Sequence, residues 1–328
     1  MNDLRRCLVV GLPGLALSAM TARAHAQSPL ETARLLCGYP AGGSIDTVCR
    51  TLATRMSGRY ARTVLVENKP GAAGRLVIDD TRRAAADGST ILVTPASTLT
   101  MYPHTYRKLS YDPMTDLIPV SMLASFGFTL VVGPRVPLTV KGLADFVNWC
   151  RANPKMADCG NAGAGSFPHF MAVLLARDAE VELTHVPFKG SSAAMQDVAA
   201  GQVSAVLSTE PSAMALVQAG RVRALATSWE QRSPFLPDVP TFKELGLPRL
   251  TQREWFGAFV PRGTPAAVTE TANAALVLAA DAPATREAWR AAAVVPERST
   301  ASALGAALRN EHDFWGLLIA ASGFTPET

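Results

Sequence analysis

Apolar positions follow two different spacings along the chain from residue 27 onward. Short apolar runs such as "ARLLCGYP" and "STILVT" are typical of buried strands. Between such runs the apolar residues recur at helical spacing, as in a helix predicted to begin at Ser44, where Ile45, Val48, Leu52 and Met56 share one face. This alternation predicts βαβ units, in which helices cover a parallel sheet.

The same alternation starts again after "PVSMLASFGFTLVVGP", residues 119–134. It predicts helices over residues 140–153 and 169–177, with strands over 183–188, 203–208 and 221–228. A proline-rich loop, "RSPFLPDVPTFKELGLP", leads to a further strand, "WFGAFVP", and the rest of the chain is predicted to be almost entirely helical. We therefore predict two α/β lobes, with the C-terminal helices returning to the first.

The first 26 residues have a different pattern. Arg5 and Arg6 precede an apolar run from Cys7 to Met20, and Ala24-His25-Ala26 has the small-x-small pattern of a cleavage site. The run is shorter than the ~20 residues of a spanning helix, and Pro13 interrupts it. We predict a secretory signal peptide, residues 1–26, cleaved after Ala26, and a periplasmic mature protein. Sec export is the default, and the arginine pair leaves a twin-arginine route open.

Composition restricts the class of protein. A chain of 328 residues, 48% hydrophobic and 18% charged, buries substantial cores and suggests about two domains. Removal of Asp3, Arg5, Arg6 and Arg23 with the signal peptide lowers the formal net charge from +4 to +2. No basic run with interleaved aromatic residues occurs, so no nucleic-acid partner is predicted.

Four cysteines remain after cleavage, in a compartment that permits disulfides. A Cys37–Cys49 bridge is conceivable because a strand and the helix folding back over it could bring the two together, whereas Cys150 and Cys159 are poorly placed for one. The alternative, given equal weight, is that all four cysteines are buried free thiols. No Cys-x-x-Cys or His-x-x-x-His spacing occurs, so we predict no metal site.

Glycine-rich loops at strand ends are the candidate binding features. In "GYPAGGSIDTVCR", Gly42 and Gly43 would present backbone N–H groups at the start of a helix, whose positive end favours an anion. Ser44 is the predicted N-cap, and Asp46 is a first-turn carboxylate favoured by the helix dipole. By itself this loop is as well explained by a tight turn.

Two further loops have the same placement. "GNAGAGSFPH", Gly160 to His169, again follows a strand and opens a helix. In "TPASTLT", Ser97 and Thr98 offer hydroxyl groups after a strand. Three such loops at strand ends together favour a ligand cleft between the lobes.

Enzyme motifs are absent from the sequence. It has no Gly-x-Ser-x-Gly, no Gly-Lys-Ser/Thr of a P-loop, and no dinucleotide fingerprint in "GNAGAGS". His104, His185 and His312 are scattered and fit structural or surface roles. Lys189 could contact an anion, but its position at the entry of a helix favours solvent. We expect a binding protein without a cofactor, and a hydrolase is the less favoured alternative.

The chain resembles the Bug-type extracytoplasmic solute receptors, the binding proteins of tripartite tricarboxylate transporters. The resemblance covers essentially the whole mature chain, in motifs that lie in unrelated loops. These motifs are "YPAGGSIDTVCR", "VLVENKPGAAG", "AAADGSTILV", "YRKLSYDPMTDLIPVSMLA", "THVPFKGSSAAMQDVAAGQV", "AGRVRALATS" and "RSPFLPDVPTFKELGLP". It implies a type II periplasmic-binding-protein fold, with a ligand cleft between two lobes joined by two crossing strands. We place lobe 1 at residues 27–126 plus 251–328 and lobe 2 at 127–250.

The resemblance also implies a small carboxylate ligand, bound by backbone amides, hydroxyls and water. Where many relatives have a carboxylate and an amide this chain has Ser208 and Thr209, and Ala96 replaces a common serine. Without that acidic group we expect a plain carboxylate rather than an amino acid. The partners implied are the membrane subunits of a secondary transporter or, alternatively, a sensor kinase, and we expect a monomer. The predicted ligand-binding residues are Tyr39, Gly42, Gly43, Ser44, Ser97, Thr98, Gly163, Ala164, Gly165, Ser166, His169, Ser208 and Thr209.

The signal peptide gives the first testable prediction. The exported protein should begin at Gln27, because Ala24-His25-Ala26 follows a short apolar run. Intact-mass measurement of the exported protein checks this, and a mass that still includes residues 1–26 would overturn it.

Overall fold

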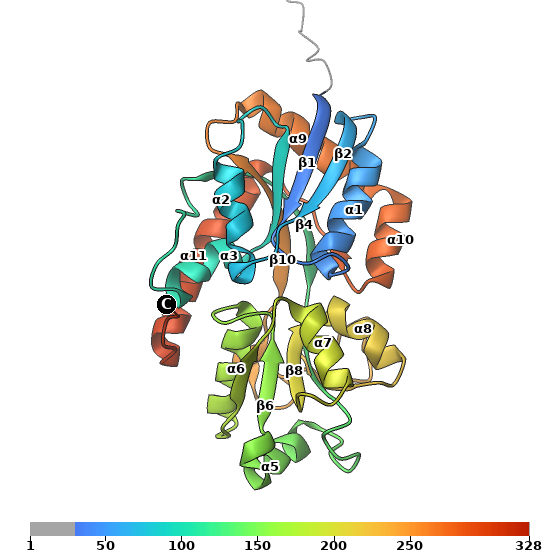
Figure 1. The fold of residues 1–328 in the computed structure, drawn as a ribbon, viewed down its shortest axis with the longest axis vertical. Helices are drawn as coiled ribbons and strands as arrows, with labels where there is room; N and C mark the ends of the chain where they lie inside the picture. The colour runs from blue at the N-terminus through green and yellow to red at the C-terminus, as the bar shows by residue number, and fades with distance from the viewer. Residues whose placement is uncertain (1–29, 328) are drawn as a thin grey trace, which may run out of the picture.

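The computed structural model describes residues 30–327. The signal peptide predicted for residues 1–26 lies outside the described residues. Two β-sheets organise the chain, one above the other in Figure 1, and each forms a lobe with the helices packed on it. Lobe 1 is the upper one in this view and contains β1; lobe 2 contains β6 and β8.

The sheet of lobe 1 has the strand order β11-β4-β10-β3-β1-β2. β1, β2 and β3 are parallel, as the alternating pattern predicts, whereas β10 is antiparallel to both of its neighbours. The strands are β1 (Leu30–Cys37), β2 (Ala61–Asn68), β3 (Thr90–Pro95), β4 (Leu117–Phe126), β10 (Glu254–Pro261) and β11 (Val295–Pro296).

The first helix confirms the predicted apolar face. α1 (Ser44–Met56) begins at the predicted residue and buries Ile45, Val48, Leu52 and Met56 in the core. The shorter helices of this lobe are α2 (Leu76–Arg82), α3 (Ser97–Thr100) and α4 (Tyr102–Thr105), with a 3-10 turn at Ala72–Gly74. β3, between β1 and β10, is buried along its whole length.

The sheet of lobe 2 has the order β7-β6-β8-β5-β9. β6, β7 and β8 are parallel, and β5 is antiparallel to β8 and β9. The strands are β5 (Phe128–Val132), β6 (Asp158–Asn161), β7 (Thr184–Pro187), β8 (Ala205–Thr209) and β9 (Arg223–Thr227). The helices are α5 (Leu143–Ala152), α6 (Phe167–Asp178), α7 (Ser191–Ala199) and α8 (Glu210–Gln218), with 3-10 turns at Pro154–Met156 and Pro248–Leu250.

The chain crosses between the lobes along two adjacent segments. Only Gly127 separates β4 of the first sheet from β5 of the second, and the return path leads from β9 through residues 228–253 to β10. The N–H of Ser228 donates to the carbonyl of Phe128 at 2.9 Å, and the hydroxyl of Ser228 donates to the carbonyl of Gln252 at 2.6 Å. These bonds hold the two crossing segments side by side.

The C-terminal helices are α9 (Ala266–Asp281), α10 (Pro283–Ala291) and α11 (Ala301–Ser322). α9 packs on α1 and β4, and α11 packs on β4 and α3, all of which belong to lobe 1. α11 also reaches α6 of lobe 2 (Figure 1), where the ring centroid of Trp315 lies 5.0 Å from that of Phe167. The last long helix therefore contacts both lobes.

Within residues 30–327, no helix is both long and apolar enough to cross a bilayer. Cys37, Cys49, Cys150 and Cys159 are buried free thiols, so of the two alternatives the structure has four thiols and no Cys37–Cys49 bridge. Cys37 Sγ accepts a hydrogen bond from Asn68 Nδ2 at 3.0 Å.

Candidate ligand-binding cleft

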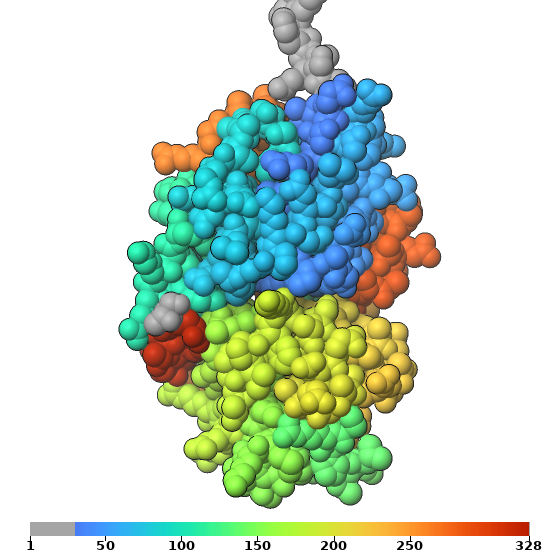
Figure 2. Space-filling model, viewed as in Figure 1, coloured from blue at the N-terminus to red at the C-terminus, as the bar shows by residue number. Residues whose placement is uncertain are grey.

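A cavity lies where the two lobes meet. Its volume is about 120 Å³, several times the roughly 10–15 Å³ that one buried water needs, so it has room for a small molecule. Its lining includes Tyr39 from the loop after β1 and Ser166 from the loop after β6. In Figure 2 the two lobes touch along a seam across the middle of the molecule, at the level of this cavity.

Six of the predicted ligand-binding residues line the cavity. Five of them follow the carboxyl ends of β1, β3 or β6, and the sixth is the last residue of β8. Open α/β sheets bind ligands at this edge. These six are Tyr39, Gly43, Ser44, Ser97, Ser166 and Thr209.

The N-termini of four longer helices face this cavity. The N-caps of α1, α6, α7 and α8 are Gly43, Ser166, Gly190 and Thr209, and all four line it. Ser166 accepts the N–H of His169, whereas the side chains of the other three caps accept no backbone N–H of their helix. Thr209 Oγ1 donates instead to Ser212 Oγ at 2.9 Å. First-turn N–H groups of α1 and α7 are therefore left for other acceptors, and the positive helix ends favour an anion. In α8 the N–H of Glu210 donates to the carbonyl of Gly127 at 2.9 Å, and Pro211 has no N–H.

The predicted N-cap of α1 is wrong by one residue. Gly43, not Ser44, is the N-cap, because its backbone is extended, with φ of −79°, and Ser44 already belongs to the helix. A glycine in this position leaves the first-turn N–H groups of α1 uncovered. Ser44 itself lines the cavity and is partly exposed.

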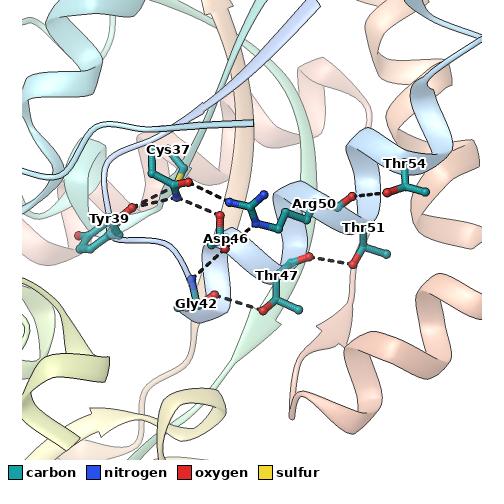
Figure 3. Close-up of polar contacts among 10 residues, drawn as sticks. Cys37, Tyr39, Gly42, Asp46, Thr47, Arg50, Thr51 and Thr54 are labelled. Carbon is teal, nitrogen blue, oxygen red and sulfur yellow. Dashed lines mark hydrogen bonds and ion pairs between the residues drawn. The ribbon is translucent and has the colours of Figure 1, made fainter. Parts of the chain in front are cut away.

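Asp46 does more than complement the dipole of α1. It is buried and accepts hydrogen bonds from the N–H of Gly42 at 2.9 Å, from Arg50 Nε at 2.8 Å and from Asn68 Nδ2 at 3.0 Å. Figure 3 shows Asp46 between Gly42 and Arg50. Burial alone would raise the pKa of Asp46, but the hydrogen bonds from Arg50, Gly42 and Asn68 lower it overall. Asp46 thus anchors the glycine loop to α1 and β2.

Three predicted residues lie outside the cavity lining and have protein partners. Gly42 has a positive φ of 84° and its N–H is taken by Asp46, so it shapes the loop. Thr98 Oγ1 donates to the carbonyl of Pro95 at 2.8 Å in the core of lobe 1. Ser208 is buried within β8, and its hydroxyl donates to the carbonyl of Thr209 at 3.2 Å.

Residues 163–165 of the second glycine loop contact lobe 1 instead of lining the cavity, although Ser166 of the same loop lines it. The hydroxyl of Tyr106 donates to the carbonyl of Ala164, and Thr105 Oγ1 donates to the carbonyl of Gly165 at 3.0 Å. Gly163 accepts the Ser166 hydroxyl at 2.6 Å. Of the predicted loop residues, Gly163, Ala164, Gly165 and His169 are outside the lining.

His169 supports this loop as a neutral imidazole. Its Nδ1 accepts the N–H of Gly165 at 3.0 Å, and its ring stacks on that of His185 at a centroid distance of 3.7 Å. Burial, with a smaller effect of His185, lowers the pKa of His169 to about 3. The ring is therefore uncharged at neutral pH and holds the loop by a hydrogen bond.

Several lining residues are not among those predicted from the sequence. Ser191 and Ser192 open α7 after β7 and Gly190, the same strand–glycine–helix order that marks the other loops, so that signal could have found them. Glu254 lies at the start of an apolar strand and gave no such signal. The exposed Lys189 also reaches the lining. The remaining additions are Pro40, Ile45, Pro95, Tyr102, Phe126, Phe128, Ala162, Phe167, Pro168, Gly190, Ala193, Ser212 and Phe256.

Two α/β lobes around a cavity that faces several helix N-termini define a two-lobed solute-binding protein. The family described as "Tripartite tricarboxylate transporter family receptor" matches residues 48–324. The chain belongs to this family, which consists of substrate-binding receptors rather than enzymes. It is 29% identical to Protein BugT of Bordetella pertussis in an alignment 329 residues long, which spans 98% of this chain and 99% of BugT.

Solved structures confirm the fold class. The periplasmic binding protein BugD is 26% identical, with a TM-score of 0.83 over 90% of this chain and 99% of BugD. MatC from Rhodopseudomonas palustris, with bound malate, is 29% identical, with a TM-score of 0.83 over 89% of this chain and 99% of MatC. Rpa4515 of R. palustris, with adipate, is 27% identical, with a TM-score of 0.85 over 90% and 98% of the two chains. The expected periplasmic-binding-protein fold is therefore shown.

The Asp46 contacts predict a pH-dependent loss of stability. Asp46→Asn should lower the free energy of unfolding at pH 7 by about 1–3 kcal/mol, since a buried group loses charge-assisted hydrogen bonds. The lowered pKa of the folded state means that wild-type Asp46 contributes stability above 3.8, its ordinary pKa, and loses it as the pH falls further. Urea unfolding of both proteins across this range should show the difference shrinking in acid; a difference that does not change with pH would contradict the assignment.

Proposed function

We propose that this chain captures a small carboxylate in the inter-lobe cavity and delivers it to the membrane subunits of a tripartite tricarboxylate-type transporter. The ligand carboxylate accepts hydrogen bonds from first-turn N–H groups of α1 and α7. Ser44, Ser191 and Ser192 line the same cavity and offer hydroxyl donors. Charge-assisted bonds of this kind are roughly twice as strong as neutral ones.

The observation that carries this proposal is the convergence of helix N-termini without side-chain caps from both lobes. α1 belongs to lobe 1, and α7 and α8 belong to lobe 2, yet Gly43, Gly190 and Thr209 all line one cavity. Each unpaired N–H group removed from water costs about 1–3 kcal/mol, and an anion between the lobes supplies the missing acceptors. Malate in MatC and adipate in Rpa4515 support a carboxylate as that anion.

The remaining parts of the proposal concern location and organisation. We propose export to the periplasm with cleavage after Ala26, which the periplasmic relative BugD supports. We also propose residues 27–126 plus 251–328 as lobe 1 and residues 127–250 as lobe 2. The strand order supports this division, since β10 pairs with β3 and β4 in the first sheet.

The test begins with a thermal-shift screen of mono-, di- and tricarboxylates. A ligand that binds only the folded state stabilises it by about 2.7 kcal/mol at about 100 times its dissociation constant. Gly43→Val then tests the amide loop. Calorimetry with the ligand found should show affinity about 10- to 100-fold weaker, because the side chain stands between the N–H groups and the anion.

Gly142→Val is the matched control. Gly142 is the N-cap of α5, its φ of −141° is likewise extended, and it lies outside the cavity lining. A Cβ added at Gly43 or at Gly142 meets no atom closer than 3.5 Å, and both positions have ordinary negative φ, so both variants should fold. Equal affinity of Gly43→Val and Gly142→Val would show that the loop is a turn without a role in binding.

A further inference from the structure

The cavity lining contains one carboxyl group, that of Glu254, among the described residues. Glu254 is the first residue of β10 and pairs with Phe126, the last residue of β4, at the place where both strands leave lobe 1. It is 5% exposed. A buried carboxyl group is therefore built into the junction between the lobes, inside a site that otherwise favours anions.

Ser97 is the one residue within residues 30–327 that hydrogen-bonds this carboxyl group, by its backbone N–H and with a further contribution from its side chain. Oε1 accepts the N–H of Ser97 at 3.0 Å, and no other residue in this range donates to Oε2. Oε2 of Glu254 is not fully enclosed by protein, unlike Oε1 of Glu210, which is buried without a hydrogen-bond partner. Oε2 of Glu254 is thus available to whatever occupies the cavity.

No cation of the described chain neutralises Glu254. The groups that act on its ionisation are Ser97 and Glu311, neither of which is positively charged. Burial raises the pKa of Glu254 to about 7, and Glu311 adds to the effect, against the hydrogen bonds from Ser97. The exposed Lys189 also reaches the lining but forms no ion pair with Glu254.

Aromatic rings form the surface next to this carboxyl group. Phe126 and Phe256 lie with their centroids 4.5 Å apart, and Phe128 lies 5.8 Å from Phe126. All three line the cavity. The faces of aromatic rings attract ammonium groups, and the attraction grows where water is excluded. A carboxylate oxygen beside such rings is a site for an organic cation.

We propose that the ligand carries an ammonium group, held by Glu254 and the aromatic rings, in addition to the carboxylate held by the helix N-termini. The ligand class is then an ammonium carboxylate such as an amino acid or a betaine. This inference rests on the proposed function and makes it more specific. It differs from the expectation of a plain carboxylate, which rested on the absence of an acidic residue at Ser208 and Thr209. Glu254 supplies that acidic group from a different strand.

A plain dicarboxylate would behave differently at this site. Its second carboxylate would face Glu254, and two carboxylates at one site must share a proton to avoid repulsion. Its binding would therefore take up a proton from solution, whereas an ammonium carboxylate would favour ionised Glu254 and bind without uptake, releasing any proton that Glu254 carried. Calorimetry in two buffers of different ionisation enthalpy measures that uptake.

The experiment compares ligands of matched chain length on the wild-type protein. At each carbon-chain length a monocarboxylate, a dicarboxylate and an ammonium carboxylate are tested, by thermal shift and then by calorimetry. We expect the ammonium carboxylates to bind best, without proton uptake. Tighter binding of mono- or dicarboxylates would overturn this inference and leave the proposed function intact. If no member of any set binds, the proposed function itself fails.

Glu254→Gln tests the residue directly, with Glu311→Gln as the matched control. Glutamine keeps an oxygen for the N–H of Ser97 but loses the charge, so affinity for the ammonium carboxylate should fall about 10- to 100-fold. Glu311 is half-buried, its pKa is likewise raised to about 7 by burial, and it accepts Trp255 Nε1 at 2.6 Å outside the cavity lining. Its variant should bind normally. Unchanged or tighter binding by Glu254→Gln would contradict the inference.

Discussion

The unpaired N–H groups at the starts of α1 and α7 are the constraint on which the binding site depends. Both helices have a glycine as the N-cap, which offers no side chain to accept these N–H groups. Buried donors without acceptors are costly. The lobes therefore enclose this cavity favourably only when an anion or water supplies those acceptors, which couples ligand capture to the approach of the lobes.

The crossing segments determine what lies between those helix ends. β4 and β5 are joined through Gly127, where a Cβ would come within 2.3 Å of Trp229 Nε1, so the crossing accommodates no side chain there. The same crossing places Phe126, Phe128 and Glu254 in the cavity. A mostly apolar wall with one carboxyl group thus faces a set of positive helix ends. The two surfaces differ in charge and select different parts of a ligand.

Much of the fold followed from the sequence pattern, because periodicity and turn residues are local signals. α1 begins at the predicted Ser44 and buries the predicted face, and the parallel strands lie where the apolar runs are. The site was only partly predictable. Loops at strand ends indicated Gly43 and Ser166, but whether a loop N–H meets the cavity or another loop depends on long-range contacts such as Tyr106 with Ala164. Glu254 is far in sequence from every glycine loop, and only the pairing of β10 with β4 brings it there.

The most direct measurement is a crystal structure with the carboxylate that stabilises the protein best. The account predicts that carboxylate oxygens lie about 2.7–3.2 Å from first-turn N–H groups of α1 and α7, between Gly43 and Gly190. A carboxylate bound to a side-chain cation such as Lys189, with those N–H groups contacting only water, would contradict it.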